Sequence, residues 1–313
     1  MTKLLKLLAG VALLAAAATL APARADDIHI IVVSHGQAND PFWSVVKNGV
    51  TKAAADQKVT VDYRAPETFD MVKMGQLIDA AVNQRPAGLV VSIPDASALG
   101  PSIKRAVAAG IPVISMNSGS DVSHGMGALL HVGQDEFTAG KIAGAKLKEM
   151  GGSNAICVNH EVGNVSLDLR CKGFAAGFGG KVRVVPTSND PSDITAKTKA
   201  ALSTDPSIDT VMALSASLGG EATLAAVKQI GMIGKIRLAT FDLSASYLKA
   251  VAAGEATFCI DQQQFLQGYL PVTFLALYAR DGLMPGGDVA SGPNLITKDK
   301  AAKAIELSAQ GIR

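Results

Sequence analysis

The 313-residue sequence lacks the short motifs that identify many nucleotide-dependent and metal-dependent enzymes. It has no Gly-x-x-x-x-Gly-Lys-Ser/Thr phosphate loop, and no Gly-x-Gly-x-x-Gly leads from a strand-like run into a helix. His160-Glu161 begins like the helix of a zinc protease but lacks the second histidine, and the five histidines show no ligand spacing. These absences argue against an enzyme and predict neither a cofactor nor a metal.

Cysteine is scarce, with only Cys157, Cys171 and Cys259. An exported protein can form disulfides, and an odd count leaves one thiol free. Because Cys157 lies in a strand-like run and Cys171 opens the following helix, we expect a bridge between these two. Cys259 lies in the apolar run 256–260 and is expected to be a buried free thiol. No histidine partner for a catalytic cysteine can be identified.

The sequence has only one long apolar run, and it lies at the N-terminus. A basic start, an apolar segment to Leu20 and an Ala-x-Ala exit at 23–25 predict a secretory signal peptide, residues 1–25. A retained membrane anchor is the less favoured alternative, because a cleavage pattern bounds the run and no second long apolar segment follows. We therefore expect a protein exported to the periplasm.

The chain also lacks a strong excess of either charge, since 29 basic residues against 27 acidic ones give a formal charge of +2. The predicted signal peptide contains basic residues and no acid, so the exported chain would be slightly negative. This charge indicates neither nucleic acid nor an anionic membrane surface as a partner.

What the sequence does contain is an alternation of short β-branched runs with longer helical segments. In residues 69–84, for example, apolar residues recur near helical spacing, and helices are also expected over 265–280 and from Lys298. Such alternation predicts parallel sheets covered by helices on both faces, an α/β fold. The expected strands are 28–34, 58–64, 87–93, 112–117, 129–133, 154–159, 182–187, 208–214, 236–241 and 256–261.

So many strands exceed the usual single sheet. We therefore expect two doubly wound parallel-sheet lobes joined by a multi-strand hinge, with a ligand cleft between the carboxyl ends of their strands. The Gly/Ser-rich segment 118–126 is the expected crossover between the lobes. The predicted N-terminal lobe comprises residues 26–131 plus 263–290, and the C-terminal lobe 132–262 plus 291–313.

Aromatic residues make up only 4% of the chain, yet the segment 37–49, which contains the single tryptophan, Trp43, lies just after the first strand-like run. A ligand dense in hydroxyl groups needs planar polar partners such as Asp, Asn, Gln and Arg, and an aromatic ring to cover its apolar face. Residues of these types gather at the predicted strand ends and predict a sugar or polyol site: Asp40, Phe42, Trp43, Asn117, Arg170, Asp242 and Gln262.

The first three of these residues also have structural interpretations. Asp40 followed by Pro41 fits a helix N-cap and first helical position, so capping alone would explain both. Phe42 or Trp43 would be a core residue if the first turn of that helix packs on the sheet. The sequence leaves these alternatives open.

The later residues have equally simple alternatives. Asn117 and Asp242 fit turn positions after strands. Arg170 would form a weak surface ion pair if it meets Asp168 or another exposed acid. Of the three glutamines at 262–264, at most one or two can face a cleft.

Taken in order, these segments resemble the periplasmic sugar-binding proteins of ATP-driven importers, specifically the ribose-binding type that shares its fold with lac-repressor-type regulators. The resemblance covers essentially the whole exported chain. It implies a type I periplasmic binding protein fold, without cofactor or metal, that captures a small sugar or polyol and delivers it to an ABC transporter permease. The segments that carry it are 39–43 with 47–49, 110–114, Arg170 before Gly173-Phe174, Phe241-Asp242 and Asp261-Gln262.

The resemblance also implies roles for single residues. Asp40 would hydrogen-bond the sugar while Phe42 and Trp43 contact its ring, and the residues expected to bind further oxygens are Arg170, Asp242 and Gln262. Ser215 stands where the family commonly has asparagine. Asn117-Ser118 stands where sugar binders of this type often have Asp-Arg; the loss of a charge-assisted bond and a bidentate fork argues against ribose itself. The polar loop 159–168 adds Asn164 as a further candidate.

Other functions are compatible with the same sequence. A receptor that presents its ligand to a chemoreceptor or sensor kinase would have the same pocket and fold. A secreted carbohydrate-active enzyme would need two carboxylates flanking a bond, for which Asp40 and Asp242 are the candidates. A transcription regulator of this fold is disfavoured because a leader stands where a DNA-binding helix pair should be. We expect a monomer that binds no nucleic acid.

Overall fold

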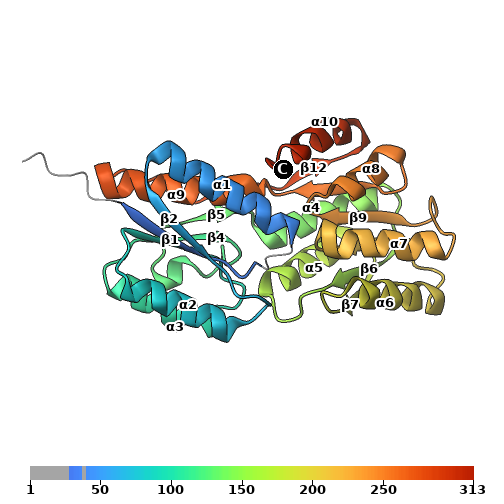
Figure 1. Cartoon of the computed structure of the whole chain (residues 1–313). Helices are drawn as coiled ribbons and strands as arrows, with labels where there is room; N and C mark the ends of the chain where they lie inside the picture. Colours follow the sequence, from blue (N-terminus) through green and yellow to red (C-terminus); the bar gives the residue numbers. More distant parts are fainter. Residues whose placement is uncertain (1–27, 37–39) are drawn as a thin grey trace, which may run out of the picture.

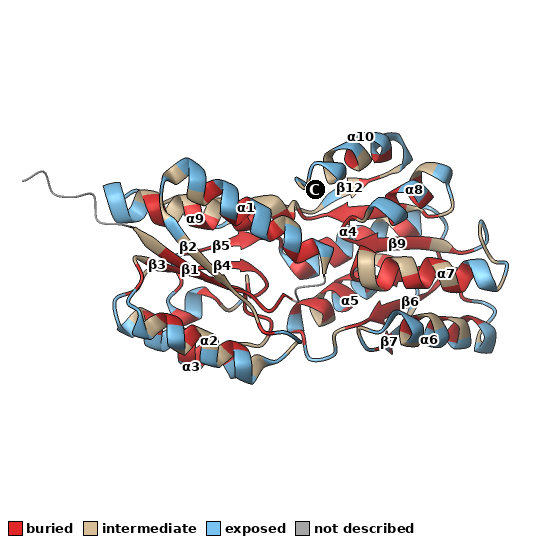
Figure 2. Cartoon of the chain, viewed as in Figure 1, coloured by how far each residue is buried: buried red, intermediate tan, exposed pale blue. Residues whose placement is uncertain are grey.

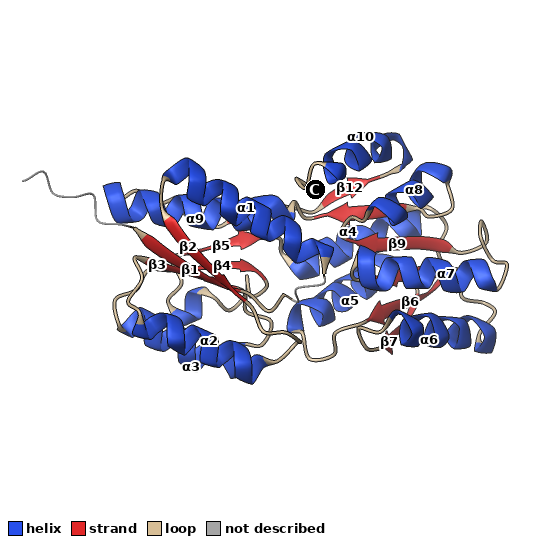
Figure 3. Cartoon of the chain, viewed as in Figure 1, coloured by secondary structure: helices blue, strands red, loops and turns tan. Residues whose placement is uncertain are grey.

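The computed structural model describes residues 28–36 and 40–313, and it has two α/β lobes side by side (Figures 1 and 3). The predicted signal peptide, residues 1–25, lies outside the described residues. No helix within the described ranges is both long and apolar enough to cross a membrane. Every strand segment expected from the sequence overlaps an observed strand.

The first sheet has six parallel strands in the order β11-β5-β4-β3-β1-β2. Helices α1 and α9 cover one face, and α2 and α3 cover the other (Figure 1). The strands are β1 His29–Val33, β2 Thr60–Arg64, β3 Gly88–Val91, β4 Val113–Asn117, β5 Leu130–Gly133 and β11 Val289–Ala290; the helices are α1 Pro41–Gln57, α2 Met71–Asn83, α3 Ala96–Ala108 and α9 Gln264–Asp281.

The second sheet also has six strands, in the order β12-β10-β9-β8-β6-β7, and only β12 is antiparallel. Its strands are β6 Asn154–Asn159, β7 Lys181–Pro186, β8 Thr210–Ala213, β9 Arg237–Phe241, β10 Phe258–Asp261 and β12 Asn294–Ile296. Its helices are α4 Glu136–Glu149, α5 Val165–Phe178, α6 Pro191–Thr204, α7 Glu221–Gln229, α8 Ala245–Ala253 and α10 Lys298–Ala309.

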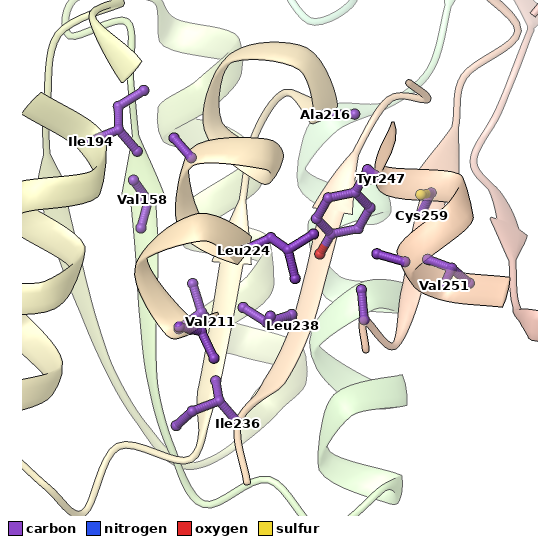
Figure 4. Packing of buried hydrophobic residues seen from close by; sticks show 14 of the residues in the cluster. Val158, Ile194, Val211, Ala216, Leu224, Ile236, Leu238, Tyr247, Val251 and Cys259 are labelled. Carbon is purple, nitrogen blue, oxygen red and sulfur yellow. The ribbon is translucent and has the colours of Figure 1, made fainter. Parts of the chain in front are cut away.

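The central strands of both sheets are buried on both faces, as Figure 2 shows. In β1, Ile30 and Val32 pack under α1 and α9, whereas Ile31 and Val33 pack under α2 and α3. This alternation explains why the strands read as continuous apolar runs, which is typical of parallel sheets between helical layers. In the second lobe, Tyr247 of α8 lies fully buried in the cluster drawn in Figure 4.

The crossover between the lobes differs from the prediction. Segment 118–126 stays within the first lobe, because the following strand β5 still pairs with β4. The chain leaves the first sheet only after Gly133, where Asp135 caps α4. It returns between β10 and α9, and crosses again between β11 and β12. The sequence did not predict β11 and β12, which are only two and three residues long.

Cys157 in β6 and Cys171 in α5 form a disulfide, with their Cα atoms 5.8 Å apart. The disulfide links α5 to strand β6 in the N-terminal half of the helix, next to Arg170 and two turns from the N-cap Asn164. Cys259 is a buried free cysteine in the core of the second lobe (Figure 4), and burial raises the pKa of its thiol.

Candidate functional site

A polar cavity lies where loops from the carboxyl ends of both sheets meet. In parallel α/β sheets this edge is where helices begin and where ligands bind. The space that its walls leave unfilled, including space open to solvent, is about 500 Å³. All nine residues predicted to bind a ligand line this cavity: Asp40, Phe42, Trp43, Asn117, Asn164, Arg170, Ser215, Asp242 and Gln262.

The first turn of α1 forms the wall on the side of the first lobe. Asp40 is the N-cap of this helix, and its Oδ1 accepts a hydrogen bond of 3.0 Å from the backbone N–H of Phe42. Phe42 and Trp43 are each 7% exposed, and their ring centroids lie 5.2 Å apart in an edge-to-face arrangement. The structural and the site interpretations therefore hold together, because these rings pack in the core and also line the cavity.

Asn117 and Asp242 end strands of opposite lobes, and Gln262 joins them. Asn117 and Asp242 adopt left-handed backbone conformations, with φ of 63° and 66°. Asn and Asp tolerate this conformation better than other non-glycine residues. Gln262 donates from Nε2 to Asp242 Oδ1 at 2.5 Å, and its Oε1 accepts from Asn117 Nδ2 at 3.4 Å and from Gln267 Nε2 at 2.9 Å. This buried amide cluster fixes the orientation of three cavity groups.

Arg170 forms a buried ion pair, which corrects the surface pairing considered from the sequence. Its Nε and Nη2 donate to the two carboxylate oxygens of Glu136 at 2.6 and 2.9 Å, and Nη1 donates to Leu214 O at 2.9 Å. The guanidinium also lies 4.5 Å from the centroid of the Phe241 ring. Asp168 instead accepts a bond from Asn159 Nδ2. Arg170 is therefore held rigidly, with a further N–H on both Nη1 and Nη2.

The loop after β6 contributes a second carboxylate–amide pair. Asn164 is the N-cap of α5, with Oδ1 accepting from the Ser166 N–H at 3.0 Å. Its Nδ2 donates to Glu161 Oε2 at 2.7 Å. Both residues line the cavity, so the cap of α5 also positions a carboxylate there.

Burial controls the ionisation of the cavity. It raises the pKa of Asp40 and Glu161, and it raises the pKa of Asp242 to about 7. It lowers the pKa of His35 and of His160 to about 3, so both imidazoles are neutral at physiological pH. Arg170 is thus the only cationic side chain among the described residues that line the cavity.

Two direct contacts close the cavity between the lobes. Ser217 Oγ, just after Ser215, donates to Asp40 Oδ1 at 3.2 Å. The backbone N–H of Val165 donates to Pro94 O at 3.0 Å. The lobes are therefore in direct contact beside the site, which corresponds to a closed arrangement.

Several wall residues were not predicted from the sequence: His35, His160, Glu161, Ser166, Leu167, Leu214 and Leu218. For His35, His160 and Glu161 a usable signal existed, because they directly follow the carboxyl ends of β1 and β6. Both His160 and Glu161 lie in the polar loop 159–168 that the sequence predicts at the cleft, where Asn164 is the residue named as a ligand contact. Among the described residues no group of three His, Cys, Asp or Glu side chains is placed to hold a metal.

Comparison with known proteins places this geometry among sugar-binding proteins. Residues 30–283 match the family described as the periplasmic binding protein domain. A carbohydrate transporter protein from Acidothermus cellulolyticus 11B, solved in complex with myo-inositol, is 36% identical, and the match covers 91% of this chain and 99% of that one with a TM-score of 0.86.

Two further proteins are similar over most of the chain. A periplasmic sugar-binding protein of an ABC transporter from Legionella pneumophila is 25% identical, with a TM-score of 0.78 and coverage of 84% of this chain and 99% of that one. The xylose/arabinose-binding protein XylF of Sulfolobus acidocaldarius is 25% identical over 284 residues, which are 86% of this chain and 70% of XylF.

Proposed function

Because the chain belongs to the periplasmic binding protein family, we propose that it captures a small sugar or polyol between its lobes and delivers it to an ABC transporter permease. The observation that carries this proposal is the cavity itself, in which carboxylates, amides and one guanidinium meet the rings of Phe42 and Trp43. Planar polar groups suit hydroxyls, and an aromatic wall suits the apolar face of a sugar ring.

We propose all nine predicted wall residues as ligand contacts. The buried ion pair with Glu136 supports Arg170, since it holds the guanidinium in one orientation while N–H groups remain for a ligand. The left-handed backbone supports Asn117 and Asp242, because strained residues concentrate at functional sites. The shared capping role of Asp40 and Asn164 supports those two positions, because a capped helix end is rigid.

We propose the two lobes predicted from the sequence, with the first boundary moved from 131 to 133 because β5 of the first sheet ends at Gly133: residues 26–133 plus 263–290, and 134–262 plus 291–313. The last strands support this division, because β11 joins the first sheet and β12 joins the second. In this mechanism the open form exposes the cleft, and ligand contacts from both lobes favour the closed form. The closed form then docks on the permease.

Further parts of the proposal concern location and partners. Removal of a signal peptide would release the protein into the periplasm as a monomer, and it would bind its ligand without changing it chemically. Presentation of the ligand to a chemoreceptor is the alternative use of the same closed form. Pull-down with the permease or with a chemoreceptor domain, with and without ligand, separates these uses.

A thermal-shift screen tests the central proposal. A ligand that binds only the folded protein raises its apparent stability, by about 2.7 kcal/mol at a concentration of 100 times Kd. We expect at least one of myo-inositol, D-xylose and L-arabinose, or another sugar or polyol, to raise the melting temperature. If no small hydroxylated solute shifts the melting of well-folded protein, the proposal is wrong.

A further inference from the structure

The segment that follows β1 is held by hydrogen bonds from β2 and from the residue that follows β3. Oγ of Ser34 lies 2.7 Å from the hydroxyl of Tyr63 in β2, and it accepts from the backbone N–H of Gly36 at 3.3 Å. The backbone N–H of His35 donates to Oγ of Ser92 at 3.0 Å. His35 is therefore fixed at the carboxyl edge of the first sheet, where it lines the cavity.

The hydrogen bonds of Ser92 define which nitrogen of the His35 imidazole carries the proton. Nδ1 lies 2.8 Å from Oγ of Ser92, which is a fully buried residue. This oxygen already accepts from the backbone of His35, and its hydrogen has no other partner among the described residues. A proton on Nδ1 would leave that hydrogen buried without an acceptor, which disfavours this tautomer by about tenfold or more. Ser92 therefore donates to Nδ1, and Nε2 carries the proton.

The surroundings of the His35 imidazole keep it neutral. Its ring centroid lies 4.7 Å from that of Trp43 and 6.0 Å from that of Phe69, both in edge-to-face arrangements. Burial, together with the positive charge of Arg170, lowers the pKa of His35 to about 3. A neutral imidazole that accepts at Nδ1 donates only at Nε2, so the ring is a fixed single donor.

Nε2 is the polar atom of this ring that a ligand can reach. It has no hydrogen-bond partner among the described residues, whereas Nδ1 is occupied by Ser92. A second pair of this kind lies in the same lobe, where Nδ1 of His131 is 2.9 Å from Oγ of Ser115. In that pair Nε2 is sealed from solvent and has no partner among the described residues. Of the two histidines, only His35 lines the cavity.

We infer that His35 is a specificity-determining ligand contact that donates a hydrogen bond from Nε2 to an oxygen atom of the ligand, and that Ser92 is the positioning residue that fixes this tautomer. The inference rests on the proposed function, because it adds a contact to the same cavity. A hydroxyl or ether oxygen satisfies this donor. A ligand with a methylene group at that place leaves the donor buried and unpaired, and should bind about tenfold more weakly.

Nitrogen NMR of the full exported chain labelled with 15N-histidine tests the tautomer without any ligand. His35→Gln identifies the resonances of His35 among those of the five histidines. We expect the proton on Nε2 in the native protein, and a mixture with the Nδ1 tautomer in Ser92→Ala. A native His35 with its proton on Nδ1 would overturn the inference, whatever the ligand is.

Isothermal titration calorimetry tests the contact. The probes are myo-inositol, D-xylose and L-arabinose, and variants are compared with the probe that binds most tightly. His35→Phe keeps a ring but removes the donor, and should lose about tenfold in affinity. His35→Gln places an amide N–H near the position of Nε2 and should recover most of that loss. Equal losses in both variants would show a packing effect and would overturn the donor role, as would unchanged affinity in His35→Phe.

The matched control for Ser92→Ala is Ser115→Ala. Both changes remove a serine hydroxyl from a buried serine–histidine pair in the same sheet, but Ser115 serves a histidine outside the cavity. We expect Ser92→Ala to weaken binding by about threefold, which is less than the loss of a whole hydrogen bond, and Ser115→Ala to leave affinity unchanged. Equal effects of the two would overturn the positioning role of Ser92.

Single-deoxy derivatives of the same probe locate the oxygen that His35 serves. For one derivative the loss of affinity in the native protein should largely disappear in His35→Phe, because the two changes remove the same hydrogen bond. Fully additive losses for every derivative would overturn the contact. Thermal unfolding checks each variant, and His35→Phe combined with Ser92→Ala removes the stranded hydroxyl if the single variant folds poorly. Absence of binding by every sugar and polyol would overturn the proposed function instead, since the tautomer is measured without ligand.

Discussion

The two lobes share an architecture but build different walls of the cavity. The first lobe contributes mainly rings, with the Phe42 and Trp43 side chains beside His35, whose ring centroid lies 4.7 Å from that of Trp43. The second lobe contributes mainly charged and polar groups: Glu161, Asn164, Arg170, Ser215 and Asp242. Each wall is built at the same place in its fold, at helix starts after parallel strands.

This difference separates two contributions to binding. The directional groups of the second lobe are already positioned without the first, because Arg170 is held by Glu136 and Glu161 by Asn164, all within that lobe. The ring wall comes from α1 and meets the ligand from the opposite side. Changes in the second lobe should therefore remove binding, and changes in the first should weaken the closed complex.

The largest expected effect is that of Arg170→Met. The substitution removes ligand donors and leaves Glu136 buried without its cation, and breaking such a pair costs about 3–5 kcal/mol of folding stability. Two lost bonds from a charged donor, at about 1.5–3 kcal/mol each, predict a loss of affinity of more than about 100-fold. Calorimetry measures the affinity and thermal unfolding measures the stability.

A double variant separates the two effects of this change. Glu136→Gln in the Arg170→Met background removes the stranded charge, so part of the melting temperature should return while binding stays lost. Arg105→Met is the surface control, because its exposed pair with Asp79 is worth little. If Arg170→Met bound ligand normally, the second lobe would not be the source of the directional contacts.

The corresponding change in the first lobe, Trp43→Ala, should have a smaller effect on binding. Loss of the apolar face that Trp43 offers to a ring should cost about 2 kcal/mol, or roughly thirtyfold in Kd. Because Trp43 is the only tryptophan, saturating ligand should also change the intrinsic fluorescence of the native protein. Unchanged emission together with unchanged affinity in the variant would assign Trp43 to the core alone.

A control for Trp43→Ala must account for packing, since the ring also contacts the core and the backbone at Gly36. Trp43 belongs to the cluster under α1 and α9, and a Cβ at Gly36 would approach its ring within 2.1 Å. Val46→Ala on the same helix is buried in the same cluster without lining the cavity. It should lower stability without changing affinity.

The sequence predicted the fold in detail because its signals are local. Short apolar runs such as 88–91 and 113–116, which contain Val and Ile and lie between turn residues, favour buried strands of a parallel sheet, and amphipathic spacing defines the helices between them. The short strands β11 and β12 were not predicted because two or three residues carry no periodicity. The crossover was misplaced because a Gly/Ser-rich loop indicates a turn but not its destination.

For the candidate site, the sequence predicted several wall residues but not the long-range partners that hold them. Site residues that follow strands were predicted where they lie in a segment typical of the family, as Asp40 and Asp242 do. The partner of Arg170 was not found, because Glu136 lies 34 residues away in sequence and meets it only through the packing of α4 on α5. Likewise the buried amide cluster, which includes Asn117, Gln262 and Gln267, joins residues up to 150 positions apart. Long-range polar pairing of this kind is not encoded in a local pattern.

The smallest expected effect is a dependence of binding on pH. It tests whether the ligand binds the carboxylates of the second lobe in their ionised form. Burial raises the pKa of Asp242 to about 7; the nearby charges of Asp40 and Glu136 also raise it, while Arg170 and the bond from Gln262 lower it. A ligand hydroxyl that donates to the ionised carboxylate favours that form and lowers its pKa in the complex. Affinity should therefore approach its full value at about pH 8 and fall by about tenfold between pH 8 and pH 6.

Without ligand the same group should act in the opposite direction on stability. The pKa of Asp242 is higher in the folded chain than in the unfolded one, so the folded state binds more protons between about pH 4 and pH 7. The contribution of Asp242 to folding stability is therefore present at low pH and is lost as the pH rises through about 7. Asp242→Asn should abolish its share of both trends, measured by calorimetry and by thermal unfolding between pH 5 and 8. Affinity that rises on acidification would show that the ligand binds the protonated carboxyl. In that case Asp242 would donate a hydrogen bond to the ligand instead of accepting one.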